Sequence, residues 1–128
     1  MSDSKSTYSE ASEYYVNVTV PQNDIDRDRY LRSKDREKKW NQDWLKNKVN
    51  VNEVVDRFVP KGDPKRSFHT EGGVKFDFEG TRYKIKCDKV AGYLRIFDKK
   101  VGMFCKLDGT PSRNLKETHF KIKKRGEM

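Results

Sequence analysis

Apolar and polar residues alternate most regularly between residues 80 and 98. A period of two over residues 82–87 puts apolar side chains on one face of a strand and basic side chains on the other, and residues 93–97 alternate in the same way. Residues 88–92 are a short connection that contains a glycine, so the two strands are predicted to pair as an antiparallel hairpin. One face of the hairpin is then apolar, and the other is basic and aromatic.

The segments on either side of this hairpin also favour strands. Residues 74–78, 103–107 and 118–123 are short and apolar at alternate positions, and tight turns separate the first two of them from the hairpin. Closely spaced strands of this kind predict an antiparallel meander, with residues 108–116 as the one long loop within it.

Residues 50–58 form the best predicted helix. Asn50 can cap its first turn, and Glu53 follows three residues later, as in a capping box. The apolar residues recur at the spacing of one helix face, which predicts that this face packs on the sheet. We therefore expect an α+β fold in which residues 50–128 form a compact domain of a short helix and four to five antiparallel strands. Residues 1–49 are expected to be a flexible or helical charged segment.

The patterns before the compact domain are weaker. Residues 1–13 are rich in serine without apolar periodicity, so they are expected to be disordered. Residues 14–20 alternate and suggest an edge strand or an extended arm. Residues 24–48 mix acidic and basic side chains as a solvated helix does, and Trp40 and Trp44 stand four positions apart on a stripe that would dock on another surface.

Composition limits the chain to one small domain with a basic surface. Its 128 residues are 33% hydrophobic and 38% charged, and the net charge is +9. The region from Ser67 onward holds fifteen basic and eight acidic residues, an excess of +7 that favours a nucleic acid or an acidic protein as partner. No apolar run reaches the roughly 18 residues of a membrane span, and the polar start lacks the apolar core of a signal peptide. No membrane association is expected.

Cysteine and histidine are too sparse to indicate a metal site. Cys87 and Cys105 fall on predicted apolar faces, where buried free thiols are common, and a disulfide between them stays open. The two histidines stand far apart, so no zinc spacing is present. Carboxylates are scattered as well, which argues against a two-metal nuclease. The sequence predicts neither a metal nor a cofactor.

The last predicted strand adds a histidine to the basic face. Phe120 and Ile122 are expected to point into the core, which leaves His119, Lys121 and Lys123 on the opposite side. If this strand folds back beside the hairpin, the histidine and these lysines share a face with the basic residues of the hairpin, Arg95 among them. The expected RNA-binding residues are Lys84, Lys86, Tyr93 and Lys123.

This face has the parts that metal-free RNA cleavage requires. The 2′-hydroxyl must lose a proton, the leaving 5′-oxygen must gain one, and the phosphorane needs positive charge around it. Histidine can move the protons, while arginine and lysine stabilise the charge. Nearby cations are expected to lower the pKa of His119 and so keep a base available. An idle surface histidine explains His119 equally well, and His69, in a predicted polar loop, is the next candidate.

Several strings within residues 50–128 resemble a family of bacterial toxins. NEVVDRFVP, GTRYKIKCDKVAGYLRIFDKK, KLDGTP and ETHFKIKKR are similar to the small C-terminal domains of polymorphic toxins that contact-dependent inhibition and related systems deliver. The resemblance points to the ribonuclease superfamily that includes barnase, EndoU, the colicin-type tRNases and RelE. It implies one or two N-terminal helices followed by a four- or five-stranded antiparallel sheet with the active site on the sheet face.

The resemblance also implies roles and partners. His119 and Thr118 would be the polar pair of the active site, with Lys121 and Arg95 as phosphate partners. The substrate would be tRNA or rRNA, and an acidic immunity protein would neutralise the toxin. The protein would act in the bacterial cytoplasm, after secretion or display at the cell surface. The leading expectation is therefore a metal-independent endoribonuclease toxin.

Two other functions fit the same sequence. A non-catalytic RNA- or DNA-binding module would use the same basic face without needing His119. An immunity or adaptor protein would bind another protein through Trp40 and Trp44. The basic charge argues against the second of these, because a protein that masks a basic toxin is expected to be acidic.

Overall fold

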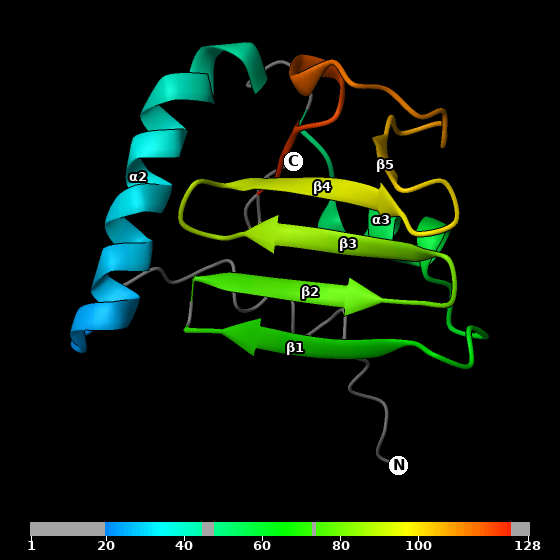
Figure 1. Cartoon of the computed structure of the whole chain (residues 1–128), viewed down its shortest axis with the longest axis horizontal. Coiled ribbons are helices and arrows are strands. Elements are labelled where there is room, and N and C mark those ends of the chain that lie inside the picture. Colours follow the sequence, from blue (N-terminus) through cyan, green and yellow to red (C-terminus); the bar gives the residue numbers. More distant parts are fainter. Residues whose placement is uncertain (1–19, 45–47, 73, 124–128) are drawn as a thin grey trace.

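The computed structural model describes residues 20–44, 48–72 and 74–123, which fold into two α-helices and a six-stranded antiparallel sheet (Figure 1). The strand order is β1-β2-β3-β4-β5, and β6 pairs with the start of β4 while β5 pairs with its end. The predicted α+β fold with an antiparallel sheet is confirmed. The elements are α2 Asp24–Trp44, α3 Val51–Phe58, β1 Ser67–Glu71, β2 Lys75–Glu79, β3 Tyr83–Asp88, β4 Tyr93–Asp98, β5 Met103–Cys105, a 3₁₀ helix Leu115–Glu117 and β6 Phe120–Lys121.

Helix α3 begins where the sequence predicts. The side-chain oxygen of Asn50 accepts hydrogen bonds from the backbone N–H groups of Asn52 and Glu53, at 2.9 and 3.2 Å, and so caps the first turn. The predicted apolar face of the helix is buried. Its residues are Val51, Val54, Val55 and Phe58.

The sheet has one apolar and one polar face. Alternate residues of β2, β3 and β4 join the residues of α3 in the core, and α3 lies behind the sheet in Figure 1. Cross-strand partners share a face, so Ile85 lies between Phe78 and Ile96, and all three are 0% exposed. The charged residues at the intervening positions consequently lie on the opposite face, away from α3. They are Asp77, Lys84, Lys86 and Arg95.

The prediction for the segment around His69 is wrong. His69 is predicted to lie in a polar loop, whereas it lies in strand β1, opposite Asp77 of β2. Strand β1 is at the edge of the sheet and has a single apolar residue, Phe68, so its alternation is too weak to predict a strand. The Phe68 ring anchors β1 on the core by contacting the rings of Phe76 and Phe78, at centroid distances of 6.3 and 4.8 Å.

The last strand is shorter than predicted, because β6 covers only two of residues 118–123. The 3₁₀ helix Leu115–Glu117 ends directly before this segment, so the chain becomes extended later than the apolar alternation suggests. His119 therefore lies just before the strand rather than within it. The residues of this segment that reach the core are Phe120 and Ile122, as predicted.

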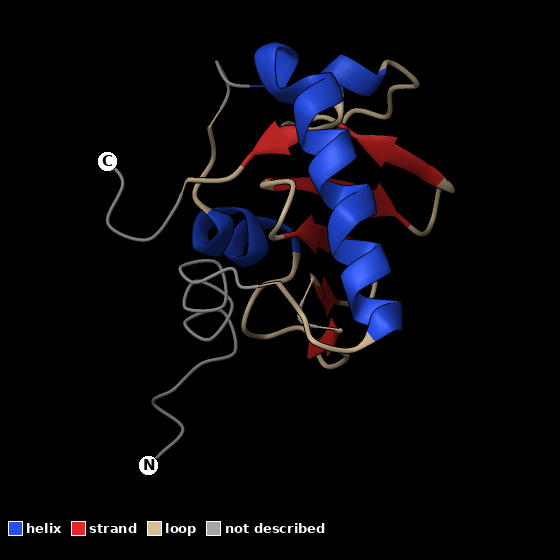
Figure 2. Ribbon diagram, turned by 90° about the vertical axis from the view of Figure 1, so that its left-hand side faces the viewer, coloured by secondary structure: helices blue, strands red, loops and turns tan. Residues whose placement is uncertain are grey.

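Helix α2 crosses the end of the sheet that holds the β3–β4 turn (Figures 1 and 2). Its mixed charge predicts a solvated helix, and Ile25 and Leu31 are exposed. A buried contact nevertheless joins it to the sheet. The Ser33 hydroxyl and the Arg36 guanidinium donate to the same carboxylate oxygen of Asp88, at 2.7 and 2.9 Å. Helix α2, which belongs to the segment 1–49 that is predicted to be flexible or helical, thus packs on the sheet.

Some predictions concern residues outside the described structure. The expected disorder of residues 1–13 lies there, as does all but the last residue of the expected strand at residues 14–20, and the side chains of Trp40 and Trp44 are not described either. In the described part, no helix combines the length and the apolar character needed to cross a membrane. The two cysteines are free thiols buried in the core.

Replacing Val55 with aspartate tests the packing of α3. Val55 is fully buried, and burying an apolar side chain of this size contributes about 1.5 to 3 kcal/mol, while a buried unpaired carboxylate adds a desolvation cost. Val55→Asp is expected to lose the cooperative thermal transition in circular dichroism. Val101→Asp, at a valine that is 48% exposed, is the control and is expected to melt close to the wild type. A wild-type melt of Val55→Asp would contradict this packing.

Candidate functional site

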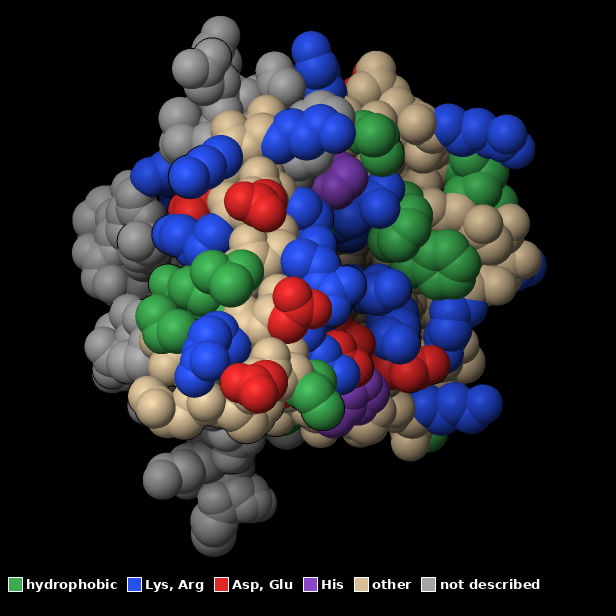
Figure 3. Space-filling view, turned by 60° about the vertical axis from the view of Figure 1, so that its left-hand side comes forward, with side chains coloured by type: hydrophobic (Ala, Val, Ile, Leu, Met, Phe, Trp, Pro, Cys, Tyr) green, Lys and Arg blue, Asp and Glu red, His purple; other side chains and the backbone are tan. Residues whose placement is uncertain are grey.

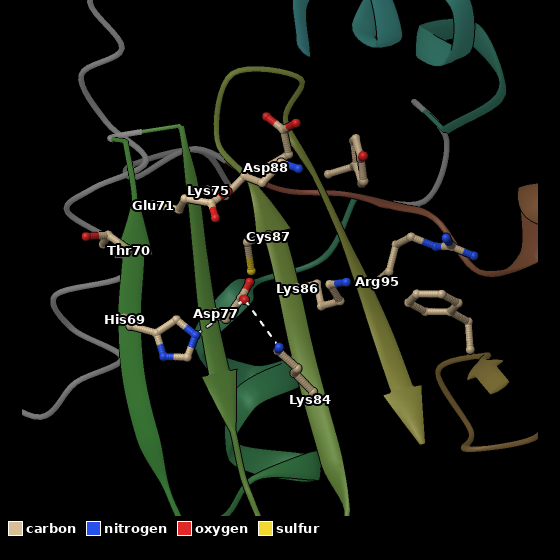
Figure 4. Close-up of a pocket in the computed structure, with 12 residues that line it drawn as sticks. His69, Thr70, Glu71, Lys75, Asp77, Lys84, Lys86, Cys87, Asp88 and Arg95 are labelled. Carbon is tan, nitrogen blue, oxygen red and sulfur yellow. Dashed lines mark ion pairs between the residues drawn. The ribbon is translucent and has the colours of Figure 1, made fainter. Parts of the chain in front are cut away.

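A hollow of about 480 Å³ opens on the polar face of the sheet (Figure 4). Its walls come from β1, β2, β3 and β4, with one aromatic residue from β5. We call it the polar groove. It is lined by His69, Thr70, Glu71, Lys75, Asp77, Lys84, Lys86, Cys87, Asp88, Tyr93, Arg95 and Phe104.

Charge in the polar groove is mixed, whereas the sequence predicts a basic face. Four basic side chains and three acidic ones line it. The register of β2 and β3 explains two of the acids, because Asp77 stands opposite Lys86 and Asp88 stands opposite Lys75. Basic and acidic side chains are accordingly interleaved between the two histidines in Figure 3. Alternation with the buried phenylalanines of β2 is a sequence signal that places Asp77 on this face.

Arg95 is held in a fixed orientation in the groove. Its Nη2 donates a hydrogen bond to the Thr118 hydroxyl at 3.1 Å, and its Nε donates to the Thr118 carbonyl at 3.3 Å. The guanidinium also stacks over the Phe104 ring, 3.5 Å from the ring centroid. Burial lowers the pKa of Arg95, but an arginine remains charged in proteins. Thr118 itself is 0% exposed, so it can act on a ligand only by orienting Arg95.

His119 is nearly buried beside Tyr93. The residue is 8% exposed, and its ring centroid lies 5.1 Å from that of Tyr93. Its Nδ1 lies 2.7 Å from the carbonyl oxygen of Leu115, and because a carbonyl only accepts, Nδ1 carries the hydrogen of the neutral ring. Burial lowers the pKa of His119 to about 4, the charge of Arg95 lowers it as well, and the bond to Leu115 opposes both. The predicted decrease is confirmed, but its main cause is burial.

The lysines predicted for the site lie in different surroundings. Lys84 and Lys86 line the groove from β3. Lys121 is 9% exposed, and its Nζ lies 3.9 Å from a carboxylate oxygen of Glu37 in α2. Lys123 is not among the residues that line the groove. The structure thus brings Lys84, Lys86, Tyr93 and Arg95 together in the groove and places Thr118, His119 and Lys121 beside it.

Asp88 lies at the end of the groove next to α2 and links the β3–β4 turn to that helix. One carboxylate oxygen accepts hydrogen bonds from the backbone N–H groups of Val90 and Ala91, at 3.0 and 2.9 Å. The other accepts from Ser33 and Arg36. Four donors therefore satisfy this buried carboxylate, which gives it a structural role.

His69 and Asp77 form a more open pair farther along the strands (Figure 4). The His69 side chain is 53% exposed, and its Nε2 lies 3.6 Å from Oδ2 of Asp77. Lys84 Nζ lies 3.8 Å from the same oxygen. Burial raises the pKa of Asp77, while the charges of Lys84, His69 and Lys86 oppose that increase. From the sequence, His69 is only the second candidate for the catalytic histidine, and Asp77 is not predicted as a site residue.

Comparison with known proteins yields no match for the chain among protein-family models, curated proteins or solved structures. Among the described residues, no group of three or more His, Cys, Asp or Glu side chains is arranged to hold a metal ion. The resemblance to ribonuclease toxins stays a prediction, and the assignment of a function rests on the chemistry of the groove.

The low pKa of His119 makes stability depend on pH. The ordinary pKa is 6.5, and His119 titrates at about 4 in the folded protein, so between these values the unfolded chain binds a proton that the folded protein does not. The free energy of unfolding is expected to fall as the pH is lowered from about 6.5 to about 4. In chemical denaturation, His119→Gln should show a smaller fall than the wild type, because glutamine does not titrate. An equal fall in both proteins would contradict the burial of His119.

Proposed function

We propose that the protein is a metal-independent endoribonuclease that binds RNA in the polar groove and cleaves it by attack of the 2′-hydroxyl. The observation that carries the proposal is the combination, in one groove on one face of the sheet, of a histidine with a fixed arginine, three lysines and aromatic rings. These are the groups that move protons, bind phosphates and stack on bases. Proton transfer alone, or RNA binding alone, would require only some of these groups.

The binding step would use the basic residues of β3 and β4. Lys84, Lys86 and Arg95 line the groove from neighbouring strands, so an RNA backbone that crosses the strands would meet them in turn. Arg95 is already oriented by Thr118 and Phe104, which reduces the entropy lost when it binds a phosphate. Tyr93 supplies a ring for stacking on an unpaired base. The mixed charge of the groove favours single-stranded segments that seat individual phosphates beside these cations.

The cleavage step would need no metal. A histidine takes the proton of the 2′-hydroxyl, the 2′-oxygen attacks the adjacent phosphorus, and the bond to the 5′-oxygen breaks as that oxygen gains a proton. Arg95 or a lysine stabilises the charge on the phosphorane oxygens. The products are one fragment that ends in a 2′,3′-cyclic phosphate and one that begins with a 5′-hydroxyl.

A toxin role would fit this activity. RNA with accessible single-stranded loops, such as tRNA or rRNA, is the substrate class that the groove favours. An acidic immunity protein would neutralise the enzyme by occupying the same groove, where its carboxylates would pair with Lys84, Lys86 and Arg95.

The second candidate is a non-catalytic RNA-binding module. The low exposure and the low pKa of His119 favour it, since a histidine that titrates at about 4 is a weak base at neutral pH. This candidate shares the groove and its cations with the first. The two differ in whether RNA is cleaved.

Incubation of the purified protein with total bacterial tRNA in EDTA tests the proposed activity. Because the proposed chemistry uses side chains alone, chelation of metals is expected to leave cleavage unchanged, and the products are expected to carry 2′,3′-cyclic phosphates. A synthetic RNA with a single 2′-deoxyribose at the cleaved position should resist cleavage there. Binding without cleavage of any RNA would favour the second candidate, and loss of cleavage in EDTA would contradict a metal-independent reaction.

Replacing Lys84 and Lys86 together with alanine tests the binding surface. Each phosphate contact to a single strand contributes about 0.7 to the slope of log K against log salt concentration, so the double variant should lower the slope by about 1.4. Lys61→Ala/Lys65→Ala removes the same charge from an exposed loop outside the groove and is the control. A larger effect of the control pair, measured by fluorescence anisotropy, would move the RNA-binding surface to that loop.

A further inference from the structure

We infer that His69 is the catalytic histidine of the proposed endoribonuclease, that Asp77 positions it, and that His119 is a positioning residue for Tyr93. The inference rests on the proposed function, because it assigns the proton transfer of that reaction to one of the two histidines. The resemblance to ribonuclease toxins implies that His119 is the active-site histidine, whereas this inference assigns that role to His69.

Access to the groove favours His69. Its side chain is 53% exposed and lines the groove directly, so a ribose and a phosphate can reach the ring without any movement of the fold. His119 is 8% exposed and is not among the residues that line the groove. A general base must come within about 2.6 to 3.2 Å of the proton that it removes, and the ring of His69 meets this condition more readily.

The surroundings of His69 also fit proton transfer. Its Nε2 faces the Asp77 carboxylate at 3.6 Å, which favours the tautomer that carries its hydrogen on Nε2 and leaves the lone pair on Nδ1 (Figure 4). The carboxylate then stabilises the cation that forms when Nδ1 accepts a proton. Lys84, 3.8 Å from Asp77, and Lys86, directly opposite Asp77 in the register, supply positive charge near the ring for the phosphate.

Asp77 differs in its contacts from Asp88, the other carboxylate of β2 and β3 that lines the groove. Asp88 accepts four hydrogen bonds from the β3–β4 turn and α2, which fix the fold. The Asp77 carboxylate forms long ion pairs with His69 and Lys84, at 3.6 and 3.8 Å, and its side chain is 19% exposed. Burial raises the pKa of Asp77, and the charges of Lys84, His69 and Lys86, together with a hydrogen bond from the Cys87 backbone, oppose that increase.

The two histidines do not act on the same phosphate. His69 is on β1 and His119 contacts Tyr93 on β4, three strand spacings of about 4.8 Å away, or about 14 Å. The ring of His119 is moreover held by Leu115. In the assigned reaction, Nδ1 of His69 takes the 2′-hydroxyl proton, the 2′-oxygen bonds to phosphorus, the P–O5′ bond breaks, and the same ring returns the proton to the 5′-oxygen. No water or metal is consumed in this step.

The test compares His69→Ala, His119→Gln and Ser67→Ala in the cleavage of total bacterial tRNA. Loss of a general acid/base lowers the rate by about 10² to 10⁴-fold, so His69→Ala should lose at least about 10²-fold in kcat with unchanged RNA affinity. Added imidazole should restore part of its rate, because the side chain that it replaces is exposed. Ser67→Ala, at an exposed position of β1 outside the groove, should cleave as the wild type does, and His119→Gln should act mainly through a higher KM.

Asp77→Asn separates positioning from folding. Asp77→Asn should lower kcat with little change in KM or in the thermal transition. The double variant His69→Ala/Asp77→Asn should cleave no more slowly than His69→Ala alone, because the two residues act as a unit. Wild-type cleavage by His69→Ala, or a kcat loss confined to His119→Gln, would overturn the assignment to His69 while the ribonuclease proposal stands. No cleavage of RNA by the wild-type protein would overturn both.

Discussion

The antiparallel pairing of β3 with β4 determines which side chains face the core and which face the polar groove. Ile85 pairs with Ile96 on the core face, and Lys86 pairs with Arg95 on the groove face. Because side chains alternate, a slip of one residue would bury the basic side chains and expose the apolar ones. The Asp88 carboxylate secures this register, since it accepts hydrogen bonds from the turn that joins the two strands. The packing of the core and the layout of the groove therefore have the same origin.

The groove divides into a structural end and an open end. At the structural end, α2 brings Ser33 and Arg36 to Asp88, and Glu37 lies near Lys121. At the open end, the side chains of His69 and Lys84 are 53% and 29% exposed. An exposed histidine beside a half-buried carboxylate stands there. We consider the open end to be the place for chemistry, and the fixed arginine of β4 to be a neighbouring phosphate site.

Local patterns in the sequence account for much of the fold. The cap at Asn50 and the spacing of valines predict α3, and strict alternation predicts β3 and β4. Strand β1 escapes prediction because Phe68 is its only apolar residue and its stability comes from contacts with β2. Strand β6 is predicted too long because alternation does not reveal the 3₁₀ helix that precedes it.

The candidate site is less predictable because it depends on pairing between strands. Alternation alone puts Lys84, Lys86 and Arg95 on one face, but it does not reveal that Asp77 stands opposite Lys86. The shielding of His119 depends on its contacts with Leu115 and Tyr93, which no local pattern contains. Charge counting therefore suggests a more basic surface than the groove presents.

Amide chemical-shift mapping with a 2′-O-methyl RNA oligonucleotide tests the central claim most directly, because the blocked 2′-oxygen prevents cleavage and leaves the binding surface to be read alone. The account predicts that the largest shifts on addition of this RNA fall on groove-facing residues of β1, β2, β3 and β4, with His69 among them. Shifts confined to the basic loop at residues 61–66 or to the turn at residues 99–100 would contradict it.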